Sequence, residues 1–260
     1  MNLESLRPLV ARIDYVAATG STNVDVAEAA LADAQAWPDL SVLAAGEQTA
    51  GRGRSGRHWQ SLPGASLSVS VLVRPKLVAI EHYGWFPILA GLAMTRAVAK
   101  LLPTAEVSLK WPNDVLVGDK KICGVLSELL SDASGVVIGV GLNLTQSQGD
   151  LPIDNATSLR LEGATVSFEA ALEGFLVEFV ALYTDFVNHR GDADASGLRR
   201  GASAKCSSIG RRVRVLLPGD QQIEGKGIEL DQSGRILVAI DGENQLYAVA
   251  AGDIVHLRHN

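Results

Sequence analysis

The hydrophobic pattern changes near residue 191, and this change limits the architectures that the chain can adopt. Before it, short apolar runs that suit strands alternate with segments of helical periodicity, as at 21–36, 83–102 and 167–188. After it comes a stretch of small residues that is typical of a linker or peripheral loop. From Arg211 onward the chain contains only short strand patterns, separated by Gly, Asp and Pro turns. The sequence therefore predicts an α+β fold, in which a mixed α/β domain over 1–208 precedes a small β-barrel over 209–260.

Two local patterns refine this expectation. Residues 65–73 read "ASLSVSVLV", where apolar residues alternate with serine, so we expect a strand buried on one face only. Ser21 or Thr22 precedes an apolar helical stripe, and either hydroxyl is a suitable N-cap.

Composition excludes several classes of protein. The formal net charge is −6, which is not typical of a nucleic-acid coat, so any bound anion requires a local basic patch. The two cysteines, Cys123 and Cys206, have no metal-ligand spacing, and this favours a reducing compartment. The N-terminus lacks a signal-peptide pattern, and Arg96 and Lys100 interrupt the longest apolar stretch. We expect a cytoplasmic protein with no membrane association.

The basic patch is concentrated in "AGRGRSGRHW", residues 50–59. Glycine lets backbone N–H groups approach an anion closely, and guanidinium groups pair with phosphate or carboxylate oxygens. A solvated basic loop, or an Arg-Gly segment that contacts RNA, remains the alternative. Trp59 favours the anion clamp, because a lid that excludes water uses an indole and a solvated linker does not.

A second polar cluster is "KWPND", where Pro112 interrupts a strand pattern. Lys110, Asn113 and Asp114 could supply a phosphate-binding amine, an amide and a Mg²⁺ ligand. A polar turn is the commoner use of such residues.

Two further segments carry polar or glycine residues on strands. In "DKKICGV", side chains alternate, so either Lys120 or Lys121 points inward and needs an anionic partner. In "VVIGVGLNL" the third glycine of a dinucleotide motif is missing. Gly139 and Gly141 are therefore expected to let another group lie close to the strand, and Asn143 could bind it by hydrogen bond.

Taken in order, "TGSTN", "EQTAGRGRSGRHW", "KWPNDVLV", "KKICGVLSE" and "VVIGVGLNL" resemble the motifs of biotin protein ligases over nearly the whole chain. The resemblance implies a class II synthetase-like mixed α/β catalytic domain and a C-terminal SH3-like barrel. It implies that biotin and ATP form biotinyl-5′-AMP with Mg²⁺, and that biotin then passes to a lysine of a biotin carboxyl carrier protein or domain. Only about 20 residues precede "STN", so we expect the single-function type, without a DNA-binding domain and without specific DNA as a partner.

The resemblance also assigns residues by motif. It implies biotin contacts from Ser21, Thr22, Asn23, Gln48, Gly51, Arg52, Gly53, Arg54, Lys121 and Gly124. It implies ATP contacts from Arg54, Arg57, Trp59, Lys110, Asn113, Asp114 and Asn143. Lys121 resembles the family's catalytic lysine, and Arg54 and Asp114 complete the expected catalytic set, with Asp114 placed to orient or accept a proton from the acceptor amine. The metal ligands stay unassigned.

Three other functions are compatible with parts of the sequence. Lipoate and octanoate transferases share the implied fold, but their Arg-Arg…Gly-Gly-Gly loop is missing. A biotin-sensing DNA binder needs a helix-turn-helix, for which no pattern is found. An RNA-binding barrel explains the C-terminal strands but not "KWPND".

Overall fold

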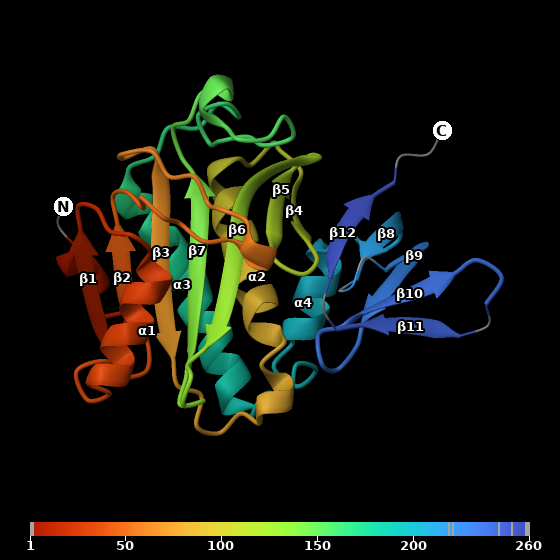
Figure 1. Ribbon diagram of the computed structural model, residues 1–260, viewed down its shortest axis with the longest axis horizontal. Coiled ribbons are helices and arrows are strands. Elements are labelled where there is room, and N and C mark those ends of the chain that lie inside the picture. The colour runs from red at the N-terminus through yellow and green to blue at the C-terminus, as the bar shows by residue number, and fades with distance from the viewer. Residues whose placement is uncertain (1–2, 218, 220, 244, 251, 258–260) are drawn as a thin grey trace.

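The computed structural model describes residues 3–217, 219, 221–243, 245–250 and 252–257, and it contains two β-sheets (Figure 1). The first has seven strands in the order β1-β2-β3-β7-β6-β5-β4, and the second has five in the order β11-β10-β9-β8-β12. Strands β1 and β2 pair in parallel, and the other neighbours in both sheets are antiparallel.

The strands of the first sheet are β1 Arg12–Val16, β2 Ser41–Ala45, β3 Ser66–Val73, β4 Val107–Lys110, β5 Asp114–Val117, β6 Lys120–Leu129 and β7 Val136–Asn143. Those of the second are β8 Arg212–Leu216, β9 Gln222–Leu230, β10 Ile236–Ile240, β11 Leu246–Val249 and β12 Asp253–His256. The α-helices are α1 Thr22–Ala32, α2 Trp85–Leu101, α3 Phe168–Asn188 and α4 Leu198–Lys205. Short 3₁₀ turns are η1 Glu4–Leu6, η2 Arg54–Gly56, η3 Ile80–His82 and η4 Gln148–Asp150.

Helices α2 and α3 cover one face of the large sheet and α1 covers part of the other (Figure 1). The predicted stripe on α3 packs inward, where Phe175, Phe179 and Phe186 are fully buried. Ser167 caps this helix, because its Oγ accepts the N–H of Ala170 at 3.1 Å. A second, smaller apolar cluster joins α1 to the sheet. The face under α1 thus stays partly open to polar groups, and this is the face that holds the site.

The prediction that residues 65–73 form a half-exposed strand is wrong, because all eight residues of β3 are buried. The apolar side chains pack toward α2 and α3, and α1 covers much of the serine side. Ser70 Oγ donates to Thr22 Oγ1 at 2.8 Å or to Asn23 Oδ1 at 2.6 Å. The serines of this strand therefore lie under α1, where they bind polar groups, and do not face solvent.

The small-residue stretch before the second sheet is also more ordered than predicted. It contains helix α4, which packs against α2, β4 and β9. Two indole hydrogen bonds join the part of the chain that forms the first sheet to the turn between β9 and β10. Trp85 Nε1 donates to Gln232 O at 2.8 Å, and Trp111 Nε1 donates to Gly234 O at 2.9 Å. The short strands that the sequence predicts from Arg211 onward are confirmed as β8–β12. The domain boundary between residues 208 and 209 falls between α4 and β8 and stays a prediction.

The second sheet contains a partly buried histidine. His256 Nε2 lies 3.0 Å from the hydroxyl of Ser208, and burial, with the nearby charges of Lys110 and Arg211, lowers the pKa of His256 to about 4.

No helix among the described residues has the length and apolar character that crossing a membrane requires.

His256 should make the protein less stable in mild acid. The unfolded histidine takes up a proton below about pH 6.5, whereas the folded one resists protonation down to about 4, so stability is lost as pH falls through this window. At pH 5 we expect this partly exposed group to lower the free energy of unfolding by about 1 kcal/mol. Urea unfolding at pH 7.5 and 5 should show a smaller loss for His256→Gln than for the wild type. An equal loss in both proteins would contradict the role given to this histidine.

Candidate active site

A cavity of about 390 Å³ opens on the α1 face of the large sheet. Its lining includes every residue that the sequence nominated for biotin or ATP except Gly51. Strands β6 and β7 form its floor, the N-terminus of α1 forms one side, and residues 51–59, here called the arginine loop, pass over it (Figure 1). The structure therefore brings together motif residues that lie up to 122 positions apart, from Ser21 to Asn143.

The "TGSTN" motif places the start of α1 in the cavity. Ser21 occupies the N-cap position, but its hydroxyl accepts no capping hydrogen bond, so a side-chain cap at this position is a wrong prediction. Gln48 Oε1 instead accepts the Thr22 N–H at 2.8 Å and lies 3.1 Å from Thr22 Oγ1. Asn23 is fixed by Ser70, as described above. These hydrogen-bonded side chains form the polar end of the cavity, beside α1.

Three strand glycines make room for large side chains above the floor. A Cβ on Gly139 would lie 2.3 Å from Asn23 Oδ1, and one on Gly141 would lie 2.3 Å from Trp59 Cε2. A Cβ on Gly124 would lie 3.2 Å from Lys121 Nζ. The groups that the sequence expected close to these strands are therefore side chains of the site itself. Trp59 lies on the floor, and its buried Nε1 has no partner among the described residues, which leaves a donor for a ligand.

The arginine loop folds back on itself as a small hairpin. Trp59 N donates to Gly51 O at 2.9 Å, and Gly53 N donates to Arg57 O at 2.7 Å. Gly56 has a φ of 72° at the hairpin tip, and a Cβ on Gly51 would meet Trp59 O at 2.4 Å. At these two positions, glycine is needed for the hairpin itself.

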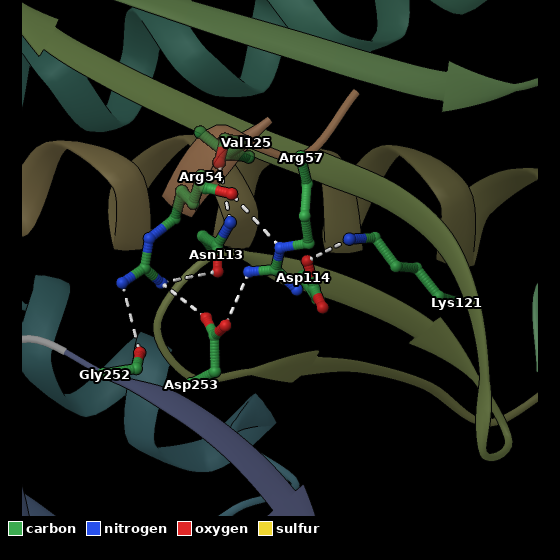
Figure 2. A network of polar contacts seen from close by, with 8 residues as sticks. All are labelled: Arg54, Arg57, Asn113, Asp114, Lys121, Val125, Gly252 and Asp253. Carbon is green, nitrogen blue, oxygen red and sulfur yellow. Dashed lines mark hydrogen bonds and ion pairs between the residues drawn. The ribbon is translucent and has the colours of Figure 1, made fainter. Parts of the chain in front are cut away.

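Two arginines of the loop converge on a carboxylate of β12 (Figure 2). Arg57 Nη2 lies 2.6 Å from Asp253 Oδ2, and Arg54 Nη1 lies 3.6 Å from Asp253 Oδ1. Arg54 also donates to Asn113 Oδ1 at 3.0 Å and to Gly252 O at 3.1 Å. The second sheet thus supplies a residue to the site. Asp253 could not be nominated from the sequence, because nothing local marks an acidic residue that acts across the fold.

The inward-facing lysine of "DKKICGV" is Lys121, while Lys120 is exposed. Lys121 Nζ lies 2.6 Å from Asp114 Oδ1, and both side chains are largely buried (Figure 2). Lys110 lies nearby, and its burial lowers the pKa of its amine, although the charge of Asp114 acts in the opposite direction. The expected anionic partner of the inward lysine is thus the last residue of "KWPND", which turns at the cis Trp111–Pro112 bond.

Asn143 lines the cavity, but its amide is already bonded within the protein. Its Nδ2 donates to Thr157 O at 2.8 Å, and its Oδ1 accepts from Gln146 Nε2 at 3.3 Å. It ties β7 to the following segment, so its ATP contact stays a prediction. Sequence reasoning also missed Glu128, which lies on the same face of β6 as Gly124 and Leu126. Alternation counted from the inward Lys121 places Glu128 on the opposite face, because it cannot foresee the register shift between β5 and β6.

The carboxylates at the cavity fit a Mg²⁺ ion that substrate phosphates help to hold. No group of three or more His, Cys, Asp or Glu side chains able to hold a metal is found in the described part of the chain. Mg²⁺ at nucleotide sites needs only one or two carboxylates, with substrate phosphates supplying other ligands. Asp114 and Asp253 offer carboxylate oxygens at the cavity.

Two parts of the chain match known protein families. Residues 19–143 match the biotin/lipoate A/B protein ligase family, and residues 208–257 match the biotin protein ligase C-terminal domain. The biotin–[acetyl-CoA-carboxylase] ligase of Mycobacterium tuberculosis is 39% identical over 95% of this chain and 90% of that protein. The bifunctional ligase/repressor BirA of Escherichia coli is 30% identical over 75% of this chain, which spans 60% of that longer protein.

Solved structures give the same result. The biotin protein ligase from Aquifex aeolicus in complex with biotin and ATP aligns with a TM-score of 0.78 and 26% identity, over 95% of this chain and 99% of that one. The Leishmania major enzyme in complex with biotinyl-5-AMP has a TM-score of 0.59 over 95% of this chain, and at 24% identity it supports the fold alone. The predicted α+β class, with a mixed catalytic domain and a C-terminal all-β part, is confirmed. The chain belongs to the biotin protein ligase family.

Proposed function

We propose that this chain joins biotin to AMP, with release of pyrophosphate, and then transfers biotin to a lysine of a biotin carboxyl carrier domain. One observation carries the assignment to this cavity: in a chain of net charge −6, five cationic side chains surround it. They are Arg52, Arg54, Arg57, Lys110 and Lys121. Both reactants of the first step are anions, and such a site offsets their repulsion.

The apolar floor and the polar end beside α1 suit the biotin ring system. Thr22, Asn23 and Gln48 present hydroxyl and amide groups at this end of the cavity. Trp59 covers β6 and β7 and contributes an indole N–H without a partner. We assign biotin to this end, and its carboxylate would then point toward Lys121.

Lys121 is placed to stabilise charge at the reacting phosphate. In the first step, a carboxylate oxygen of biotin attacks the α-phosphorus, and the bond from this phosphorus to the α–β bridging oxygen breaks. Negative charge develops on the phosphoryl oxygens and on the departing pyrophosphate. Lys121, with Arg54 and Arg57 from the loop, can bind these oxygens directly. A bound Mg²⁺ ion, held by Asp114 or Asp253 and the phosphates, would neutralise part of the same charge.

Asp114 is our candidate for the second step. The acceptor amine attacks the acyl carbon, AMP leaves, and the amine must lose a proton. Asp114 Oδ1 is paired with Lys121 at 2.6 Å, so its carboxylate lies beside the proposed acyl phosphate and can orient the amine or accept the proton. The acceptor is the carrier domain of a biotin-dependent carboxylase, in line with the printed name of the Mycobacterium relative. We also propose a cytoplasmic location, because the two free cysteines, Cys123 and Cys206, suit a reducing compartment.

The first test is substrate-dependent release of pyrophosphate. The protein is incubated with ATP and Mg²⁺ plus biotin, lipoate or octanoate, and pyrophosphate is measured by a coupled assay. We expect release with biotin and much less with the other two acids, because the polar end of the cavity offers hydroxyl and amide partners for the ureido group of biotin, which neither lipoate nor octanoate has. Adding a biotin carrier domain should give a product heavier by one biotinyl group. Equal release with octanoate would refute the assigned substrate.

A further inference from the structure

Glu128 lies on β6 just outside the lining of the cavity and joins two parts of the site. Its Oε2 accepts a hydrogen bond from Asn23 Nδ2 at 2.8 Å. Its Oε1 lies 3.1 Å from Nη2 of Arg52, the first arginine of the arginine loop. One carboxylate therefore binds the "TGSTN" helix with one oxygen and the loop with the other.

The Asn23 side of this bridge is rigid. Besides Glu128, Asn23 Nδ2 lies 3.2 Å from Leu126 O, and its Oδ1 accepts from Ser70 Oγ. Asn23 also packs over Gly139, which has no side chain to displace it. An amide bonded in this way has one orientation, and it fixes the carboxylate of Glu128 in turn.

The Arg52 side is held by little else. The Arg52 side chain is 52% exposed, and Glu128 is the acidic group with which it pairs among the described residues. Its backbone bridges His58 across the hairpin, so the orientation of Arg52 and the seating of the loop are linked. Exposed arginines have many rotamers, and a fixed carboxylate reduces that freedom.

We infer that Glu128 is a positioning residue that seats the arginine loop over the biotin end of the cavity. This inference rests on the proposed function for its catalytic consequence, but the seating itself is a property of the protein alone. Glu128 is not in the cavity lining, whereas Asn23 and Arg52 are. It therefore acts through these two residues, and biotin affinity should depend on it while the chemical step does not.

The catalytic test uses Glu128→Gln, which keeps an acceptor for Asn23 and removes the charge opposite Arg52. We expect the KM for biotin to rise about three- to fivefold, as for a partly exposed ion pair, with kcat and the KM for ATP at saturating biotin unchanged. In an Arg52→Ala background the same change should have little further effect, because its partner is already gone. A loss confined to kcat, or additive effects in the double variant, would overturn the inference.

The structural test requires no activity. Trypsin cleaves after arginine, and a poorly seated loop exposes Arg52, Arg54 and Arg57 to the protease. We expect the Glu128→Gln protein to be cut within residues 51–59 several times faster than the wild type, as followed by mass spectrometry.

Glu178→Gln is the matched control. Glu178 pairs with Arg96 and Lys100 between α2 and α3, remote from the cavity. This variant should match the wild type in both tests. If Glu128→Gln behaves like Glu178→Gln toward trypsin, the inference fails. If trypsin cleaves Glu128→Gln faster than the wild type but the wild type releases no pyrophosphate with biotin, the proposed function fails while the seating role stands.

Discussion

Replacing Lys121 with alanine should lower the rate of biotinyl-AMP formation by about 10²–10³, the usual effect of losing one group that stabilises developing charge. Lys121 Nζ reaches into the cavity from β6 and has Asp114 as its ion-pair partner at 2.6 Å. In the proposed reaction the amine binds oxygens whose charge grows at the α-phosphorus. Rapid-quench measurement of a single turnover, with saturating biotin and ATP, isolates this step from carrier transfer.

Lys120→Ala provides the control for Lys121→Ala. Lys120 is its neighbour in the chain, has the same charge, and is exposed instead of facing the cavity. Its removal should leave the single-turnover rate near that of the wild type. Circular dichroism should show an intact fold for both variants. A Lys121→Ala protein that forms the adenylate at nearly the wild-type rate would show that another group stabilises the reacting phosphate.

Replacing Gly141 with alanine should weaken biotin binding about 10- to 100-fold, or about 1.4–2.8 kcal/mol, which lies within the usual cost of overpacking. The added methyl group would lie 2.3 Å from Trp59 Cε2 and 2.5 Å from Cζ2. These are atoms of a rigid ring, so the indole must leave the floor and the wall of the pocket moves with it. Isothermal titration with biotin measures the affinity directly.

Gly149→Ala tests whether any added methyl group has this effect. Gly149 lies in η4, and a Cβ there would meet no atom within 4 Å. Its biotin affinity should equal that of the wild type. If Gly141→Ala also bound biotin normally, Trp59 would not form part of the biotin pocket in the ligand-bound protein.

Much of the fold could be predicted because its signals are local. The aromatic stripe on α3, the Ser167 cap and the turns between the C-terminal strands each depend on residues a few positions apart. The strand β3 was predicted, but the burial of its serine face was not, and helix α4 was missed, for a different reason. Burial of the serines depends on α1 folding over them, and α4 is stabilised by packing against α2 and β9, which composition does not reveal.

The site divides in the same way. Gly124, Lys121 and Asp114 could be nominated because each belongs to a recognisable motif, and the alternation of side chains on a strand required one inward lysine. Their mutual contact could not be predicted, because it depends on the pairing of β5 with β6. The role of Asp253 could not be predicted either, because its partners lie on a loop that precedes it by nearly 200 residues.

The contact between Asp253 and the arginine loop also determines when the site can form. The two ends of the Arg57–Asp253 pair are 196 residues apart in the chain. A contact this distant incurs its loop-closure entropy unless the intervening sheet and helices are already folded. During refolding from denaturant, we therefore expect both sheets to form before the loop is held, so catalytic activity should return more slowly than the circular dichroism signal.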